Sequence, residues 1–88
     1  HKRSYAGVDC VLGREITIAP MAVLGDRVTV GERVTIESGA VIGDDVIIGS
    51  DSTIKANVTI SRKCTIGDRV TIHSGTVVGS DGYGYSVN

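Results

Sequence analysis

Residues 24–43 read LGDRVTVGERVTIESGAVIG, in which a branched aliphatic residue recurs at every sixth position: Leu24, Val30, Ile36 and Ile42. The sequence alternates around Thr29, because Val28 and Val30 are apolar and the threonine between them is polar. Such alternation is typical of a short strand that buries one face. Residues 31–33 read GER, a composition typical of a turn. The stretch therefore predicts very short strands separated by corners, with a period of six residues.

The same period continues over residues 6–83 without a slip. Thirteen successive hexads begin at Ala6, and twelve of their first residues are branched aliphatics. The next residue is glycine in eight of the thirteen, and we expect these glycines to relax the steric limits on the backbone at the corners. Self-similarity at a short fixed period is typical of a solenoid, in which neighbouring repeats share one core.

Length and composition favour the same solution. The chain has 88 residues, with 12 Gly, 1 Pro, 3 Tyr and neither Trp nor Phe. A chain this short buries only a small core of its own, and three tyrosines are too few to build an aromatic-centred core. A hydrophobic fraction of 41% is nevertheless too high for a disordered chain. A repeat that shares its core between neighbours satisfies both conditions.

Three hexads close one triangular turn of eighteen residues, and parallel strands then stack coil upon coil about 4.8 Å apart. Thirteen hexads predict an all-β fold, a parallel β-helix in the form of a triangular prism with a little over four coils. We expect residues 1–5 to form its N-terminal end and residues 6–83 the β-helix. Gly84 stands where an aliphatic residue is needed, so residues 84–88 are expected to begin a loop that leaves the prism.

The charge balance excludes some classes of partner. Nine basic and ten acidic residues give a net charge of -1, which predicts neither a nucleic-acid-binding surface nor one for an acidic membrane. Apolar runs are only a few residues long, so no transmembrane segment and no secretory signal is expected within these residues. Two cysteines are too few for a disulfide scaffold, and a cytoplasmic location is the expectation. His1 in place of Met suggests that the sequence begins inside a longer protein.

Folding the sequence at eighteen residues places the outward-pointing residues in three columns. One column is all threonine, another mixes aliphatic residues with threonine, and the third is mostly valine: Thr17, Thr35, Thr53 and Thr71; Val11, Thr29, Ile47, Thr65 and Tyr83; Val23, Val41, Thr59 and Val77. A stack of exposed valines usually marks an association surface. We therefore expect a homotrimer with Val23, Val41 and Val77 near its axis. The alternative is that β-propensity alone placed valine there.

The other side chains offer little chemistry. Cys10 and Cys64 lie three coils apart, about 14 Å, which is too far for a disulfide, so both are expected to be reduced core residues. His1 and His73 cannot supply the three histidines of a zinc site, and we expect no metal and no cofactor. The acidic corner residues are expected to be turn formers: Asp26, Asp44, Asp45 and Asp68. Ice-binding β-helices show a second row of threonines beside the first. The threonine column here lacks that row, so the sequence does not predict an ice-binding surface.

One corner has its own composition. Glu37, Lys55 and His73 form a column there. The same corner carries Gly39, Asn57 and Gly75, and Gly and Asn accept a positive φ. We expect a distinct type of turn at this corner.

The end of the repeat resembles a known family. Residues 73–85 read HSGTVVGSDGYGY, which is similar to the signature H/Q-S-G-x-V-[IV]-G-[AS]-D-G-[FY]-G-[FY] of the UDP-3-O-acylglucosamine N-acyltransferases of lipid A synthesis, and residues 56–60, ANVTI, resemble another coil of that family. These proteins are hexapeptide-repeat transferases. The resemblance, rather than the periodicity, implies a left-handed β-helix, a homotrimer, and acyl carrier protein and a UDP-sugar as partners.

The implied activity is transfer of a 3-hydroxyacyl chain from acyl carrier protein to the 2-amino group of a UDP-3-O-acylglucosamine. The family places its catalytic histidine in coils beyond the D-G-[FY]-G-[FY] loop, so the resemblance implies a fragment that is inactive alone. His73 matches a position where the family also accepts Gln, which makes it only a weak candidate for the base. Asp81, Tyr83 and Tyr85 match the loop and are candidates for the wall of the substrate cleft.

Two other readings remain open. One is a non-catalytic β-helical scaffold or oligomerisation module. The other is a different hexapeptide acyltransferase or acetyltransferase. Residues beyond Asn88 would distinguish them, because a histidine-bearing coil there favours the N-acyltransferase.

Overall fold

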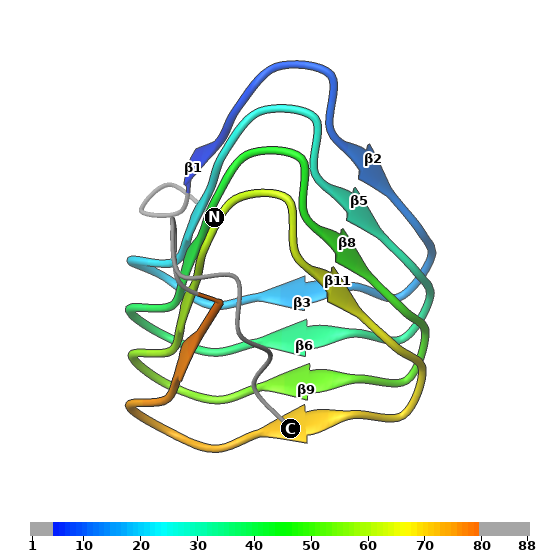
Figure 1. Cartoon of the computed structure of the whole chain (residues 1–88). Coiled ribbons are helices and arrows are strands. Elements are labelled where there is room, and N and C mark those ends of the chain that lie inside the picture. Colours follow the sequence, from blue (N-terminus) through cyan, green and yellow to red (C-terminus); the bar gives the residue numbers. More distant parts are fainter. Residues whose placement is uncertain (1–4, 80–88) are drawn as a thin grey trace.

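The computed structural model describes residues 5–79, which form short strands joined by corners and contain no helix (Figure 1). Each strand has two residues: β1 (Tyr5–Ala6), β2 (Val11–Leu12), β3 (Thr17–Ile18), β4 (Val23–Leu24), β5 (Thr29–Val30), β6 (Thr35–Ile36), β7 (Val41–Ile42), β8 (Ile47–Ile48), β9 (Thr53–Ile54), β10 (Thr59–Ile60), β11 (Thr65–Ile66), β12 (Thr71–Ile72) and β13 (Val77–Val78). The six-residue spacing predicted from the sequence is confirmed over this range.

The strands form three parallel sheets, which are the three faces of a prism. Sheet A has the order β1-β4-β7-β10-β13, sheet B the order β11-β8-β5-β2, and sheet C the order β12-β9-β6-β3. Partners are eighteen residues apart, as in the pair Val23 and Val41. Followed from β1 to β13 in Figure 1, the chain runs clockwise as the coils advance toward the viewer, which is a left-handed path. The expected left-handed parallel β-helix of a little over four coils is confirmed.

The aliphatic residue of each hexad points into the prism. Ile42, Ile48 and Ile54, one from each sheet, are fully buried and belong to a single core cluster. Burial is less complete in the first coil, where Leu12 is 43% exposed. Since each coil covers the side chains of the coil before it, stacking of successive coils supplies the apolar burial that one hexad lacks.

Positive φ angles occur at all three kinds of corner, at the third corner residue. The angle is 57° at Arg33 and 61° at Asp45, and it is 77° at Gly39. The expectation that positive φ marks one corner through Gly and Asn was therefore too narrow. Ten residues other than glycine adopt it within the described range.

The corner between sheets C and A is nevertheless a distinct turn, as expected. There the backbone N–H of Ala40 donates to the carbonyl of Glu37 (3.3 Å), and Ala22 and Thr76 make the matching bonds. These bonds close four-residue turns of the type that places Gly or another positive-φ residue third.

The hexad glycines have a different role from the one expected. Among them, within residues 5–79, only Gly79 has a positive φ. Most of them lie against the next coil instead. A Cβ built on Gly43 would come 2.6 Å from the backbone nitrogen of Arg62, closer than real Cβ contacts. These glycines allow neighbouring coils to approach, rather than allowing the chain to bend.

Both cysteines are free and pack partly buried against the core, which agrees with the expectation of reduced thiols. The thiol of Cys10 donates to the carbonyl of Gly25 (3.2 Å). In the part of the chain that the structure describes, no helix is long and apolar enough to cross a membrane.

Candidate functional site

The interior of the prism leaves no room for chemistry. Ser52 is the buried polar residue of the described core. Its hydroxyl donates to the carbonyl of Gly67 (2.8 Å) and accepts from the N–H of Val70 (3.1 Å). No buried side-chain nitrogen or oxygen of the described residues lacks a hydrogen-bond partner. Any site built from residues 5–79 must therefore lie on the outside or at an end.

His73 is the histidine within the described range. It follows β12 as the first residue of the corner between sheets C and A, and its side chain is exposed. Its carbonyl accepts the N–H of Thr76 (3.2 Å), which fixes the backbone of the turn. An exposed imidazole on a fixed backbone could exchange protons with a bound molecule.

His73 lies beside a hollow of about 350 Å³ at the C-terminal end of the described prism. Its other lining residues are mostly aliphatic: Ile66, Val70, Thr71, Ile72, Thr76 and Val78. Ile66, Ile72 and Val78 are the inward residues of the last strands of their sheets, so the hollow is the end of the core. Among residues 5–79 the lining includes one imidazole and no carboxylate, and these residues hold no group of three possible metal ligands.

The other predicted site residues fall into two groups. Asp81, Tyr83 and Tyr85 lie outside the described residues. Val23, Val41 and Val77 all point outward from sheet A, with exposed fractions of 37%, 44% and 61%. The structure thus brings these valines together in one column, as predicted, with Thr59 between the last two.

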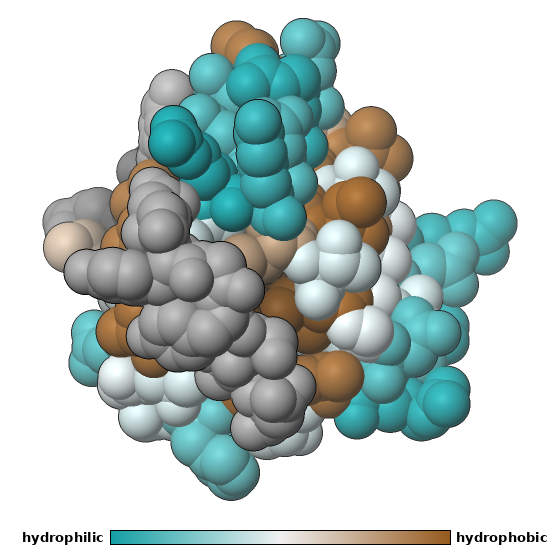
Figure 2. Space-filling model, viewed as in Figure 1, coloured by the Kyte–Doolittle hydropathy of each residue, from teal (hydrophilic) through white to brown (hydrophobic). Residues whose placement is uncertain are grey.

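The apolar column continues around the corner between sheets C and A. Met21 is the third residue of that corner and is exposed. The equivalent positions in the later coils carry no charge: Gly39, Asn57 and Gly75. Figure 2, viewed along the prism, shows apolar groups exposed between hydrophilic corners. Glu37 and Lys55 are the charged residues of this corner within the described range, so sheet A and this corner together present the least charged side of the molecule.

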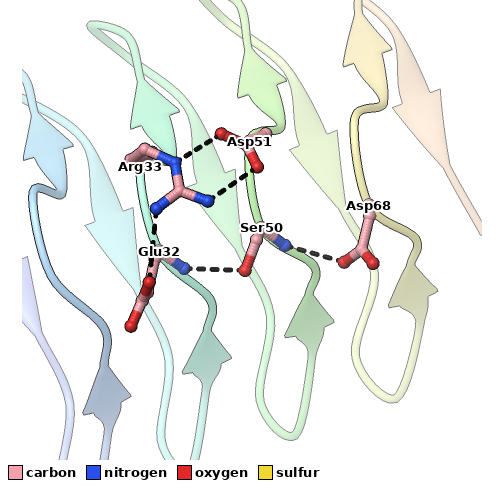
Figure 3. Close-up of polar contacts among 5 residues, drawn as sticks. All are labelled: Glu32, Arg33, Ser50, Asp51 and Asp68. Atoms are coloured by element: carbon pink, nitrogen blue, oxygen red, sulfur yellow. Dashed lines mark hydrogen bonds and ion pairs between the residues drawn. The ribbon is translucent and has the colours of Figure 1, made fainter.

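The other two corners are charged and internally paired. Arg33 binds Asp51 of the next coil with two nitrogens, at 2.7 and 3.0 Å, and also contacts Glu32 at 3.3 Å (Figure 3). At the neighbouring corner Arg27 binds Asp45 in the same way, at 2.8 and 3.2 Å. Each pair joins residues eighteen positions apart and so ties one coil to the next.

These contacts shift the acid–base properties of the pairs. The hydrogen bond and the charge of Arg27 lower the pKa of Asp45, and Lys63 adds to this effect. Arg33, together with the charge of Arg69, lowers the pKa of Asp51. Both aspartates are held as carboxylates, which suits them to bind cations rather than to act as general acids.

Acidic corner residues also satisfy the backbone, beyond forming turns. Asp44 accepts the N–H of Asp26 (2.8 Å), and Asp26 in turn accepts that of Val8 (3.0 Å). Ser50 and Asp68 make the equivalent bonds at the other charged corner, where Asp68 accepts the N–H of Ser50 (2.9 Å; Figure 3). At the corner between sheets C and A, Ser38 donates its hydroxyl to the carbonyl of Pro20 instead (2.7 Å).

The two arginine–aspartate pairs were not predicted from the sequence. Outward strand residues were aligned at a spacing of eighteen, but the third residues of these two corners were not. That alignment gives alternating acidic and basic residues in two columns and was available from the sequence. The signal for these pairs was therefore charge alternation at the coil spacing.

Comparisons with known proteins fit this architecture. The family model described as bacterial transferase hexapeptide (six repeats) matches residues 27–62 and 45–80, which together span more than half of the chain. No curated protein sequence matches significantly. Among solved structures, serine acetyltransferase isoform 3 from Entamoeba histolytica, crystallised with cysteine, is 20% identical with a TM-score of 0.47. The alignment covers 91% of this chain and 36% of that chain, so this chain spans about a third of that protein.

Proposed function

Because this chain belongs to the bacterial transferase hexapeptide family, we propose that it is the β-helical part of a cytoplasmic acyltransferase that transfers a 3-hydroxyacyl chain from acyl carrier protein to a UDP-3-O-acylglucosamine. The observation that carries the specific substrate is the run HSGTVVGSDGYGY at residues 73–85. The first seven residues of this run lie in the described prism, where they form the corner after β12, strand β13 and Gly79.

The chemistry of this transfer requires few groups. The substrate amine attacks the thioester carbonyl, an amide bond forms, the carrier thiol leaves, and a base takes the proton of the amine. Donors that face the developing oxyanion lower the barrier. His73 is the imidazole of the described range, and none of the carboxylates in that range lines the hollow beside it to orient or activate the ring.

We therefore assign the catalytic base to a coil outside these 88 residues and expect the chain alone to be inactive. Asp81, Tyr83 and Tyr85 are proposed to shape the wall of the substrate cleft. His73 is proposed to be an exposed residue near that cleft with no part in the proton transfer.

The proposed assembly is a homotrimer. Sheet A supports it, because Val23, Val41 and Val77 form an exposed apolar column beside a corner whose third residues carry no charge and include Met21. Contiguous exposed apolar surface of this kind usually marks association. Copies that meet there would bury the column and leave the two charged corners in water.

Two experiments test the proposal. Incubation of the chain with 3-hydroxyacyl carrier protein and UDP-3-O-acylglucosamine should give no turnover. Residues 24–79 grafted in place of the matching coils of a lipid A N-acyltransferase should retain transfer. The His73→Gln version of the graft should keep a similar kcat/KM, because Gln occurs at this position in the signature. Transfer by the chain alone, or an inactive but folded graft, would contradict the proposal.

A second candidate is a scaffold without catalysis. Its support is the filled interior together with the apolar column on sheet A, which are sufficient for assembly. A folded, trimeric chain whose graft is inactive with both acyl carrier protein and acetyl-coenzyme A would favour the scaffold. Activity with the latter alone would favour another hexapeptide acetyltransferase.

A further inference from the structure

Sheet B is bordered on both edges by columns of alternating charge. The third residues of the corner between sheets A and B are acidic, basic, acidic and basic in successive coils: Asp9, Arg27, Asp45 and Lys63. The third residues of the corner between sheets B and C follow the same order: Glu15, Arg33, Asp51 and Arg69. The two charged columns are therefore in phase across the face.

The inner and outer members of these columns differ in their partners. Arg27 pairs with Asp45, and Arg33 pairs with Asp51. Within residues 5–79 the outer members form no ion pair: Asp9, Glu15, Lys63 and Arg69. Two acidic groups thus remain available at the N-terminal end of the face and two basic groups at the C-terminal end.

The centre of the face between the columns is partly apolar. Val11 and Ile47 point outward from sheet B with exposed fractions of 61% and 48%. Thr29 and Thr65 alternate with them in the same column. An apolar centre with a charged rim is the usual anatomy of a protein–protein interface.

We propose that sheet B is a docking surface for a second copy of this chain, packed face to face with the prism axes antiparallel. The two-fold axis of this dimer runs across the face, along the strand direction. It leaves each corner facing the same corner of the second copy and reverses the order of the coils. The coil that holds Asp9 then meets the coil that holds Lys63, and the coil of Arg27 meets the coil of Asp45.

Because the order of the coils is reversed, opposite charges face each other in every pair of opposed coils; each such level is called a rung. Asp9 faces Lys63 of the second copy, and Glu15 faces its Arg69. Arg27 faces Asp45 of the second copy, which adds to the pair already formed within each chain. In the centre, Ile47 meets Thr29 and Val11 meets Thr65. An isologous interface must be self-complementary, and an even number of alternating rungs has this property only when the order is reversed.

The parallel arrangement is disfavoured by the same columns. A two-fold axis along the prism would bring the two different charged corners together at equal height. Asp9 would then face Glu15, and Arg27 would face Arg33, so that like charges oppose each other at every rung. Like charges held at short distance repel and suppress that mode of packing.

The proposed dimer is weak and depends on salt. Four coils about 4.8 Å apart give a face only about 20 Å tall, well below the size of a stable standard interface. Much of the attraction lies at the exposed rim, where salt screens it. Dimerisation should therefore appear at high protein concentration and low ionic strength and decline in 0.5 M NaCl. It is independent of the trimer proposed on sheet A.

A carbodiimide cross-link tests the geometry, because this reagent joins a carboxylate to an amine without a spacer. Asp9 and Lys63 of one chain lie about 14 Å apart along the prism, beyond its reach. A cross-linked peptide joining Asp9 to Lys63 at low salt, shown to be intermolecular with isotopically mixed chains, is the expected product. Ile47→Lys on sheet B should abolish it, whereas Thr17→Lys on sheet C should not.

Charge reversal supplies the second test. Asp9→Lys with Glu15→Lys, and separately Lys63→Asp with Arg69→Asp, should each weaken self-association about tenfold or more. An equimolar mixture should recover it, because reversed ends meet reversed ends. Glu32→Lys with Glu37→Lys changes the net charge equally, away from the outer rungs, and should weaken association less. Circular dichroism confirms that each variant is folded.

Sedimentation at low salt, with Val41→Lys added to remove the trimer proposed on sheet A, distinguishes the outcomes. A limit at twice the mass of one chain supports the antiparallel dimer. Growth without limit, unaffected by Ile47→Lys, would show end-to-end stacking and overturn the proposal. Absence of both the cross-link and the mass change at low salt would also overturn it.

Discussion

The two corners with arginine–aspartate pairs and the corner between sheets C and A, which has few charges, solve the same problem differently. At the charged corners, pairs such as Arg33 and Asp51 bridge successive coils, and carboxylates or hydroxyls accept backbone N–H groups. At the corner between sheets C and A, Gly39 and its counterparts turn the chain, and backbone bonds such as that from Ala40 to Glu37 close turns. Ion pairs join successive coils at two corners, whereas at the third the Ser38 hydroxyl bonds the preceding coil.

Because of this difference between the corners, the three sides of the prism are not equivalent. The interior does not distinguish the faces, because every sheet contributes the same kind of aliphatic residue. Charged corners are costly to cover, since covered charges lose hydration. Covering the corner between sheets C and A and the valine column beside it costs less desolvation free energy, because fewer charges lie there. The corners, rather than the core, therefore determine which sides can meet another molecule.

The largest expected effect tests the claim that the interior is equivalent on all sides. Ile42→Ala, Ile48→Ala and Ile54→Ala remove one buried side chain from sheets A, B and C respectively. Each should lower the free energy of unfolding by about 2–5 kcal/mol, because a cavity remains where the side chain was. Urea denaturation measures it. A cost much smaller at one sheet than at the others would show that the faces already differ inside.

The second effect concerns the glycines at the charged corners. Gly43→Ala should cost about 1–3 kcal/mol, because its Cβ would lie 2.6 Å from the nitrogen of Arg62. Gly67→Ala is the matched control in the same hexad position. Its Cβ would meet nothing closer than 3.9 Å, so stability should change by less than about 0.5 kcal/mol. Equal costs in urea denaturation would show that chain bending, not coil contact, selects these glycines.

The sequence predicted the fold because one rule repeats. Ile42, Ile48 and Ile54 obey it at each face, and any error in the period would place them in water. The role of Gly43 was misjudged, because close approach of the next coil is a contact across eighteen residues that a local turn rule does not contain. The pair Arg27 and Asp45 was missed for the same reason.

The candidate site could be predicted only in part. Val23, Val41 and Val77 were placed together correctly, since the period of eighteen determines their column. The surroundings of His73 could not be predicted from the sequence. The hollow beside it results from the way the last inward residues, such as Ile72, end the core, and this depends on three-dimensional packing.

The third effect tests whether sheet A, with its valine column, is the face through which the trimer forms. Val41→Lys places a charge in the middle of the valine column and should weaken the proposed trimer about tenfold or more, because the charge must be desolvated or exclude the partner. Thr17→Lys adds the same charge to sheet C and should leave the mass unchanged. Sedimentation equilibrium measures both. A trimer that tolerates Val41→Lys would place the interface elsewhere.

The smallest effect isolates the charged corners through pH. The folded-state pKa values of Asp45 and Asp51 are lowered from the ordinary value of 3.8 by Arg27 and Arg33. A lowered folded pKa adds stability above the unfolded pKa, and that stability is lost as the pH falls below about 3.8 through the folded value. In Arg27→Gln with Arg33→Gln the urea midpoint should be slightly lower than in the unchanged chain at pH 6. This difference should shrink toward pH 2, where protonated aspartates no longer distinguish the two. Glu37→Gln removes a carboxylate at the corner between sheets C and A, away from both arginine–aspartate pairs, and should follow the unchanged chain throughout. A difference that persists undiminished at pH 2 would mean that the arginines stabilise the corners by packing of their stems rather than by charge.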